Sequence, residues 1–216
     1  MNNLSKQKLA SLGALNVAFL AVMPQAKGQV IYNNLDVDVP VSSWGWGTLP
    51  LDLDLDGSDD FLVQNEHWCS PGFDTYSGNF EGTNGNNNEI MVYGADLAVL
   101  FTGGEKIGPV NFVGNGRAIF ASQWSYDNSF YGSTWNTATG IDTGSAGAFR
   151  NQTAMAGLRF EINGNDHYGW VRVECDSQNI IHIYDYAYES RPNTPIFVGD
   201  TLGGCATKPI KACLLY

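Results

Sequence analysis

Short apolar runs, each bounded by glycine, asparagine, aspartate or serine, make up most of the chain after residue 28. Runs of this length are typical of β-strands, and the period of an amphipathic helix is hard to find among them. The candidate strands are Val30–Val37, Phe61–Gln64, Ile90–Tyr93, Leu97–Phe101, Ala118–Gln123, Leu158–Ile162, Gly169–Cys175, Ile180–Tyr188 and Ile196–Val198. A chain with this pattern is predicted to be all-β.

Two of these runs show the alternation expected of strands that bury one face. Apolar residues alternate with charged residues in Leu158–Ile162 and again in the run that ends at Cys175. Residues 163–166, Asn-Gly-Asn-Asp, separate the two runs and have the composition of a hairpin connection. We therefore expect one antiparallel β-sandwich or jelly-roll-like domain over residues 29–200.

Two longer segments have the composition of loops. Ser70–Asn88 contains Pro-Gly, Ser-Gly and Asn-Gly pairs and an asparagine triplet, and Ser125–Gly147 is rich in serine, threonine, glycine, asparagine and aromatic residues. Long loops in a compact domain often carry binding surfaces. The alternative is that both segments only decorate the edge of the sandwich.

The first 28 residues have the layout of a secretory signal peptide. Two lysines precede an apolar stretch over Leu9–Met23, and Ala26 and Gly28 supply the small residues of a cleavage site. A membrane anchor is the alternative, but this stretch is shorter than the roughly 20 apolar residues that a spanning helix needs. We expect residues 1–28 to be removed, which leaves a secreted mature chain without a transmembrane anchor.

The charge balance of the chain is acidic. It has 11 lysines and arginines against 22 aspartates and glutamates, a net charge of -11, and loss of the three lysines of the signal peptide makes this -14. No basic patch is left to displace counterions from phosphates, so nucleic acid is excluded as a partner. The hydrophobic fraction of 44% is sufficient for a packed core.

The four cysteines all follow the signal peptide. An even number of cysteines in an exported chain indicates disulfides, for which three pairings are possible. We favour a local Cys205–Cys213 bond, which leaves Cys69–Cys175 as a long-range bond. Zinc is the alternative ligand of these thiols, but the chain has no CxxC spacing and its three histidines are scattered.

Residues 52–60, Asp-Leu-Asp-Leu-Asp-Gly-Ser-Asp-Asp, form the most specific motif of the sequence. Ca²⁺ takes six to eight oxygen ligands, which loops supply from alternate positions around a glycine turn. The predicted Ca²⁺ ligands are Asp52, Asp54, Asp56, Ser58 through its carbonyl, and Asp60.

This motif differs from an EF-hand, which has a bidentate glutamate at its twelfth position and a helix after the loop. Val63 occupies that position here, and the following residues have a strand pattern. The alternative is an acidic turn that binds nothing. Because five carboxylates within nine residues repel one another strongly without a cation, we predict a Ca²⁺ site with a structural role.

Several acidic and histidine residues are candidates for acid–base chemistry. They are Glu66 with His67, Asp166 with His167, and Asp185 with Glu189. A glycosidase needs two carboxylates that face each other across a cleft, and each of these acids equally fits a solvated strand or turn position. The chain also lacks the GxSxG, HExxH, P-loop and Rossmann motifs, so we assign no catalytic residue.

The aromatic residues suggest where a polymer could bind. Trp170 lies within a strand and is expected in the core, whereas Trp44 and Trp46 share one face that is either buried or exposed. The candidate ligand-binding residues are Trp124, Tyr126, Tyr131 and Trp135, in and next to the second loop segment. The alternative for these four side chains is packing of the loop onto the sandwich.

Three blocks near the C-terminus carry a resemblance to a known group. They are Gly157–Phe160 (Gly-Leu-Arg-Phe), His167–Val173 (His-Tyr-Gly-Trp-Val-Arg-Val) and Ile183–Glu189 (Ile-Tyr-Asp-Tyr-Ala-Tyr-Glu). Their order resembles that in secreted bacterial proteins with sorting tails of the PEP-CTERM or IPTL-CTERM type. This resemblance implies an exported β-rich protein of Gram-negative bacteria, and it implies no activity or catalytic residues.

The C-terminal segment departs from this group. Residues 203–210 resemble the start of a sorting tail, but no hydrophobic helix or basic finish follows before Tyr216. We expect residues 201–216 to be either a truncated tail or the end of a released protein.

Together, these features predict a secreted, calcium-stabilised protein without catalytic activity that acts outside the cell or at its surface and binds glycan or matrix polymer. The alternatives are a sandwich-fold polysaccharide-active hydrolase and a structural component of the envelope or matrix.

Overall fold

The computed structural model describes residues 29–41, 45–70, 73–83, 88–93, 97–126, 138–141 and 151–202. The expected signal peptide lies outside these ranges, as does all but the beginning of the C-terminal tail. The strands are β1 (Val30–Val39), β2 (Gly45–Leu51), β3 (Phe61–Ser70), β4 (Phe73–Gly82), β5 (Glu89–Tyr93), β6 (Leu97–Ala98), β7 (Lys106–Ile107), β8 (Gly114–Asn115), β9 (Arg117–Tyr126), β10 (Ala138–Ile141), β11 (Ala154–Ile162), β12 (Asn165–Cys175), β13 (Ile181–Glu189) and β14 (Ile196–Phe197). Over the same residues, the structure contains no helix with the length and apolar character needed to cross a membrane.

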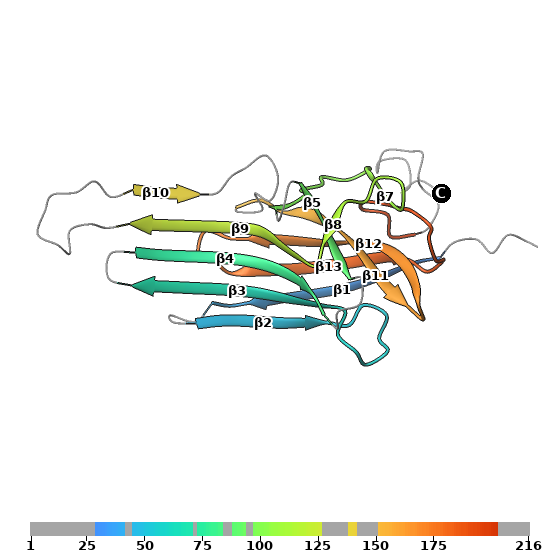
Figure 1. The fold of residues 1–216 in the computed structure, drawn as a ribbon, viewed down its shortest axis with the longest axis horizontal. Helices are drawn as coiled ribbons and strands as arrows, with labels where there is room; N and C mark the ends of the chain where they lie inside the picture. The colour runs from blue at the N-terminus through green and yellow to red at the C-terminus, as the bar shows by residue number, and fades with distance from the viewer. Residues whose placement is uncertain are drawn as a thin grey trace, which may run out of the picture.

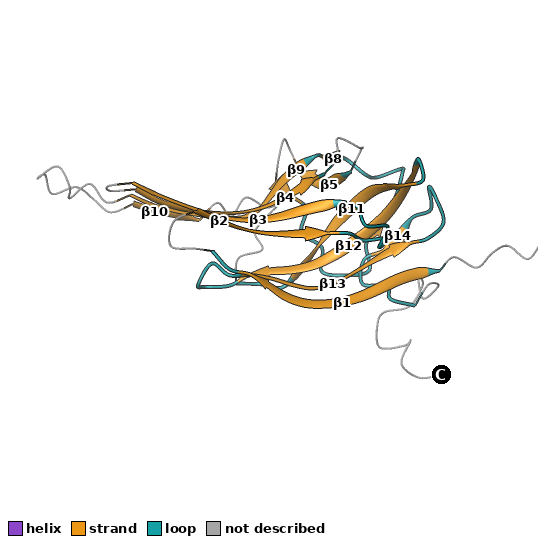
Figure 2. Cartoon of the chain, turned by 90° about the horizontal axis from the view of Figure 1, so that it is seen from below, coloured by secondary structure: helices purple, strands orange, loops and turns teal. Residues whose placement is uncertain are grey.

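Twelve of these strands form one continuous sheet. Its order is β1-β13-β12-β11-β5-β6-β9-β4-β3-β2, with β10 beside β9 and β8 beside β5, while β14 and β7 form a separate pair. The pairings are antiparallel except for that of β6 with β9. The sheet curls so that the layer of β2, β3, β4 and β9 lies against the layer of β1, β13 and β12 (Figures 1 and 2).

This architecture confirms the expectation of a single, mainly antiparallel all-β domain. The sheet is nearly closed into a barrel-like shape, because its two edge strands β1 and β2 come near each other. The hydrogen bonding runs through one sheet, so the two separate sheets of a sandwich or jelly roll are not shown.

The main core fills the space between the two layers. Phe61 of β3 and Phe160 of β11 are both fully buried and meet edge-on, with ring centroids 6.4 Å apart. A second apolar cluster lies on the other face of β12, where Trp170 packs with residues of β7 and β14. Because β12 is covered on both faces, Trp170 is in the core, as expected from the sequence.

The hairpin between β11 and β12 is confirmed, but its turn is shorter than the expected residues 163–166, because β12 already begins at Asn165. Ile162 pairs with Asn165, and the two residues between them, Asn163 and Gly164, have φ angles of 51° and 77°. Two consecutive positive φ values are the signature of a type I′ turn, whose twist matches that of the flanking strands.

The expectation that Ser70–Asn88 is a loop was wrong. This segment contains β4, a ten-residue strand that pairs along its whole length with β3 on one side and β9 on the other. Its sequence, Phe-Asp-Thr-Tyr-Ser-Gly-Asn-Phe-Glu-Gly, is rich in turn-forming residues. Pairing with two neighbours outweighs this composition, because strand preference depends more on context than on the residues themselves.

The second expected loop, Ser125–Gly147, was also wrong in part. β9 continues to Tyr126, and β10 over Ala138–Ile141 pairs with it. The rest of that segment lies outside the described residues.

At Gly169, β12 and β13 approach each other closely. A Cβ atom built on it would lie 2.7 Å from the carbonyl oxygen of Ala187 on β13. Only glycine therefore fits at this position of β12, which gives a structural reason for the Tyr-Gly-Trp sequence at residues 168–170.

Candidate metal centre

The acidic motif forms the connection between β2 and β3. Both ends of this loop are fixed in the core, because Leu51 and Phe61 are buried, and the N–H of Asp60 donates to the carbonyl of Leu51 at 2.8 Å. Within the loop, Leu55 and Gly57 have φ angles of 62° and 94°. These two left-handed residues reverse the chain and bring the start and the end of the motif together.

Backbone N–H groups of the loop orient its carboxylates. Asp52 accepts hydrogen bonds from the N–H groups of Asp56 and Gly57, at 3.2 and 2.9 Å, and Asp54 accepts one from Asp56 at 3.2 Å. The carboxylate of Asp60 accepts the N–H of Leu53 at 2.8 Å. The backbone therefore holds all three acids at the inner side of the loop.

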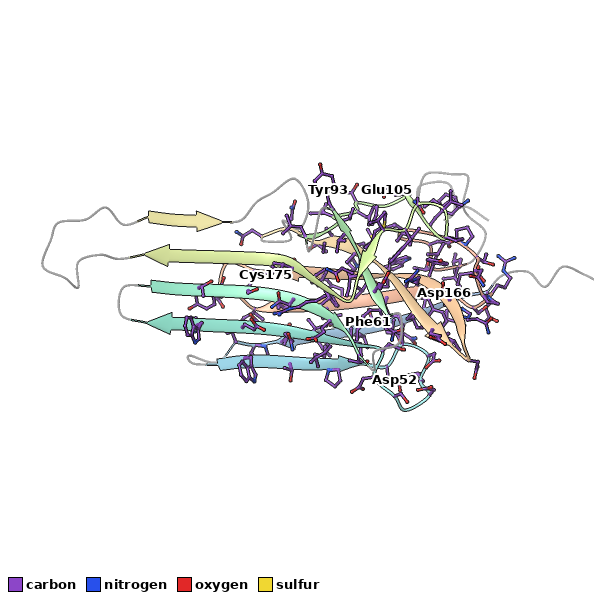
Figure 3. All side chains as sticks on the ribbon, in the orientation of Figure 1. Asp52, Phe61, Tyr93, Glu105, Asp166 and Cys175 are labelled. Atoms are coloured by element: carbon purple, nitrogen blue, oxygen red, sulfur yellow. The ribbon has the colours of Figure 1, made fainter. Side chains whose placement is uncertain are left out.

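Three carboxylates meet at this point. One oxygen from each of Asp52, Asp54 and Asp60 lies within 4.8 Å of the others, and Asp60 is only 8% exposed. Figure 3 shows Asp52 at the end of β2, where the loop leaves the sheet. Three hard oxygen donors at this spacing could hold a metal ion.

The electrostatics of the cluster disfavour three free carboxylates. The pKa of Asp60 is raised from its usual value of 3.8 to about 6, mainly by burial, with a contribution from the charges of Asp54 and Asp52 and an opposing effect of the hydrogen bond from Leu53. Burial is also the main cause of the raised pKa of Asp54. A bound cation would offset both the burial of these charges and the repulsion between them.

Two of the five predicted ligands are not in this cluster. The carboxylate of Asp56 accepts the N–H of Ser58 at 2.7 Å, and the three-carboxylate group does not include it. Participation of Asp56, and of Ser58 through its carbonyl, stays a prediction.

Asn88 supports the cluster from outside the loop. Its buried side chain donates to the carbonyl of Asp60 at 2.9 Å and accepts the N–H of Glu161 at 3.0 Å. No role for Asn88 could be predicted, because only its place in an asparagine triplet marked it and its partner Asp60 is 28 residues away in the sequence.

The β2–β3 loop also contacts the tyrosine-rich end of β13. The hydroxyl of Tyr186 donates to the carbonyl of Leu53 at 3.1 Å, and it accepts a hydrogen bond from Asn33 of β1. Burial raises the pKa of Tyr188 to about 12, and the nearby charge of Asp54 contributes to this rise. The loop is thereby tied to the strand that carries the Tyr-Asp-Tyr-Ala-Tyr-Glu sequence.

The structure leaves the expected ligand-binding aromatic residues untested. Trp124 and Tyr126 are in β9, but their side chains are not described, and Tyr131 and Trp135 lie outside the described residues. The structure also reveals a pair of exposed aromatic residues that the sequence analysis did not identify.

Trp46 of β2 and Trp68 of β3 form this pair. They are 74% and 69% exposed. Trp46 pairs with Glu66, which is two residues before Trp68, so the two tryptophans and Glu66 share the outer face of the sheet. The signal in the sequence was a Trp-Gly-Trp run at residues 44–46, which does not tell an outward face from an inward one.

The candidate acid–base residues are engaged in structural contacts. Asp185 is 2% exposed and forms an ion pair with Arg172. Its carboxylate also accepts a hydrogen bond from the hydroxyl of Tyr32 at 2.9 Å. Glu189 accepts two hydrogen bonds from the guanidinium of Arg191, at 3.1 and 3.2 Å.

Residues of the other two acid–base candidates also make structural contacts. Glu66 forms an ion pair with Arg117 at 3.2 Å, and the ring of His67 stacks on that of Tyr76. His167 is buried, and its Nδ1 contacts the carbonyl of Glu189 at 2.9 Å.

The cysteine predictions stay open. Cys175 is buried in β12, whereas the side chain of Cys69, and all of Cys205 and Cys213, are outside the described part of the chain. No disulfide is seen among the side chains that the structure describes. Neither Cys69–Cys175 nor Cys205–Cys213 is tested.

Comparison with known proteins yields no match: no protein-family model fits the sequence, and neither a curated protein nor a solved structure is similar to it.

Proposed function

We propose that the chain is an exported, non-catalytic protein that is stabilised by Ca²⁺ bound at Asp52, Asp54 and Asp60. The convergence of these three carboxylates around the buried Asp60 carries the proposal. Ca²⁺ suits the site because the donors are carboxylates and backbone groups, without a histidine or cysteine in the cluster. We further propose that the fold is best described as a β-sandwich, whose two halves are the two layers of the curled sheet.

The ion would stabilise the fold rather than take part in a reaction. The loop links β2 to β3, and through Asn88 and Tyr186 it contacts β11 and β13. A cation that neutralises the three acids would hold these parts together. Its contribution would grow with its concentration relative to its dissociation constant, as for any ligand that binds only the folded state.

Thermal unfolding with and without Ca²⁺ tests this role. We expect EDTA to lower the Tm of the wild-type protein, and Asp54→Asn to abolish the difference between EDTA and Ca²⁺. Asp59→Asn is the matched control, because Asp59 is in the same loop but not in the cluster. Equal Tm values for the wild-type protein in EDTA and in Ca²⁺ would refute the proposal.

The second part of the proposal is that the protein binds an extracellular polysaccharide through Trp46 and Trp68. Two neighbouring, largely exposed indoles are unusual on a soluble surface and mark a binding site. The apolar C–H face of a sugar ring packs on an indole, and the carboxylate of Glu66 beside the pair can accept hydrogen bonds from hydroxyl groups. The strand register places Trp124 of β9 opposite Thr75, which is itself opposite Trp68.

A further inference from the structure

A pocket of about 460 Å³ lies next to the metal loop. Its walls come from the loop itself, from the turn and strand ends of the β11–β12 hairpin, and from the end of β13. Figure 3 shows Asp52 of the loop and Asp166 of the hairpin at the same end of the molecule. The volume is within the range of about 300–1,000 Å³ that is usual for small-ligand sites.

His167 provides a fixed acceptor in this pocket. It is 4% exposed, and its Nδ1 is 2.9 Å from the carbonyl oxygen of Glu189. Because a carbonyl can only accept, Nδ1 carries the proton, and in the neutral ring Nε2 keeps its lone pair. No described residue donates to Nε2, although His167 lines the pocket. Nε2 is not among the buried polar atoms that lack a partner, so it is open to the pocket and can accept a hydrogen bond from a ligand or a water there.

The rest of the lining offers both polar and apolar contacts. Asn163 and Asn165 present side-chain amides, which donate and accept, and Ser190 presents a hydroxyl. Ile162 and the ring of Tyr188 form apolar wall. No lysine or arginine is among the lining residues, so an anionic ligand would find no permanent counter-charge.

Asp54 joins the pocket to the metal cluster. It lines the pocket, and one of its carboxylate oxygens also belongs to the group of three acids. A cation held by that group would fix the position of Asp54 and offset its charge, so a neutral ligand would meet an ordered acceptor there instead of a repelled carboxylate.

We propose that this pocket binds a neutral, polyhydroxylated ligand, a single sugar residue, whose hydroxyl groups donate to Nε2 of His167 and to Asp54. The link to Ca²⁺ rests on the proposed function, whereas the pocket and His167 do not. This site is separate from the outer face that carries Trp46 and Trp68. Because Asp54 belongs to both sites, sugar and Ca²⁺ should strengthen each other's binding by the same factor.

Saturation-transfer NMR of the full chain tests the site. The probes are glucose, galactose, mannose, rhamnose and N-acetylglucosamine, each with Ca²⁺ and with EDTA, and putrescine serves as a cationic probe. We expect transfer to at least one sugar in Ca²⁺ and an affinity that is at least about tenfold weaker in EDTA. No transfer to any sugar, or transfer to putrescine alone, would overturn the proposal.

Two variants locate the binding. Ser190→Tyr fills the pocket from an exposed position and should abolish the sugar signal while Ca²⁺ binding, measured by calorimetry, persists. His167→Phe removes the acceptor and should weaken sugar binding at least about tenfold in protein with an unchanged circular dichroism spectrum. Val110→Tyr, at a position that is 99% exposed, is the control and should bind sugar as the wild type does. Sugar binding that survives Ser190→Tyr would place it elsewhere.

The outcomes also separate this proposal from the proposed function. Ca²⁺ binding without any sugar signal would refute the pocket and leave the metal site standing. A sugar signal that is lost in Ser190→Tyr and is unaffected by EDTA would support the pocket and refute its link to the metal.

Discussion

The guanidinium of Arg172, on β12, forms a two-point ion pair with the carboxylate of Asp185, on β13. Nε of Arg172 lies 2.9 Å from Oδ1, and a second nitrogen of the guanidinium binds Oδ2. Asp185 is 2% exposed, whereas the Arg172 side chain is 43% exposed, so the arginine is the partner that solvates a buried charge. The hydroxyl of Tyr32, from β1, donates to the same carboxylate.

Removal of Arg172 alone should therefore be costly. We expect Arg172→Met to lower the free energy of unfolding by about 2–3 kcal/mol, because it leaves a buried carboxylate that has lost its main partner. Urea unfolding measures this change. Arg117→Met is the matched control, since Arg117 and Glu66 form an exposed pair, and it should cost less than about 1 kcal/mol. Equal losses in the two variants would contradict this account.

Gly169 should not tolerate a side chain. The added Cβ of Gly169→Ala would press on the carbonyl of Ala187, and the two paired strands would have to separate. We expect a loss of about 1–3 kcal/mol, as for other overpacked sites, measured by thermal or urea unfolding. A Cβ at Gly116 would meet nothing within 4 Å, so Gly116→Ala should be nearly neutral. A neutral Gly169→Ala would show that β12 and β13 are less tightly joined.

The stability of the metal-free protein should depend on pH through Asp60. Its pKa is about 6 in the folded protein and near 3.8 in an unfolded chain, so the folded state holds the proton more tightly. The resulting stabilisation is complete below about pH 4 and is lost as the pH rises through about 6. In EDTA we expect up to about 2–3 kcal/mol to disappear between about pH 4 and 7.

Differential scanning calorimetry across this range checks the prediction. Asp60→Asn removes the titrating group and should flatten the dependence of stability on pH in EDTA. For the wild type, saturating Ca²⁺ should remove the loss of stability toward neutral pH. An identical slope in the wild type and in Asp60→Asn would assign the dependence to another group.

The exposed tryptophans should matter for binding and not for folding. Trp46→Ala and Trp68→Ala should each change the free energy of unfolding by less than about 0.5 kcal/mol, because both indoles lie largely in solvent. Pull-down with insoluble polysaccharides should show retention of the wild type and loss of it in both variants. Tyr93→Ala, at a position that is 65% exposed, is the control. If a variant with both Trp46→Ala and Trp68→Ala were retained at the wild-type level, this face would be excluded as the polysaccharide-binding site.

Local patterns predicted the parts of the fold that depend on neighbouring residues. Alternation located the strand that ends at Ile162, and the turn-forming residues 163–166 located its hairpin to within two residues, since both signals are local. β4 was missed because its stability comes from β3 and β9, which pair with it from both sides. The exposure of Trp46 was undecided, because a period of two is the same for either face of a sheet.

The same distinction applies to the candidate metal site. Asp52, Asp54 and Asp60 were predicted together, because one short loop carries all three. Asn88 and Tyr186 were not connected with that loop, since they reach it from residues 28 and 133 positions away. Contacts of this kind follow from the order of strands in the sheet, which the turn signals of the sequence do not encode.

The pairing of β1 with β13 also bears on when the protein can fold. The first described strand completes its hydrogen bonds only with a strand that ends at Glu189, and the Tyr32–Asp185 bond spans 153 positions. A nascent chain therefore has no partner for β1 until nearly all of the domain has been synthesised, and closing so long a loop slows folding. The curled sheet therefore lacks one of its two edge strands, β1, until β13 is available to pair with it.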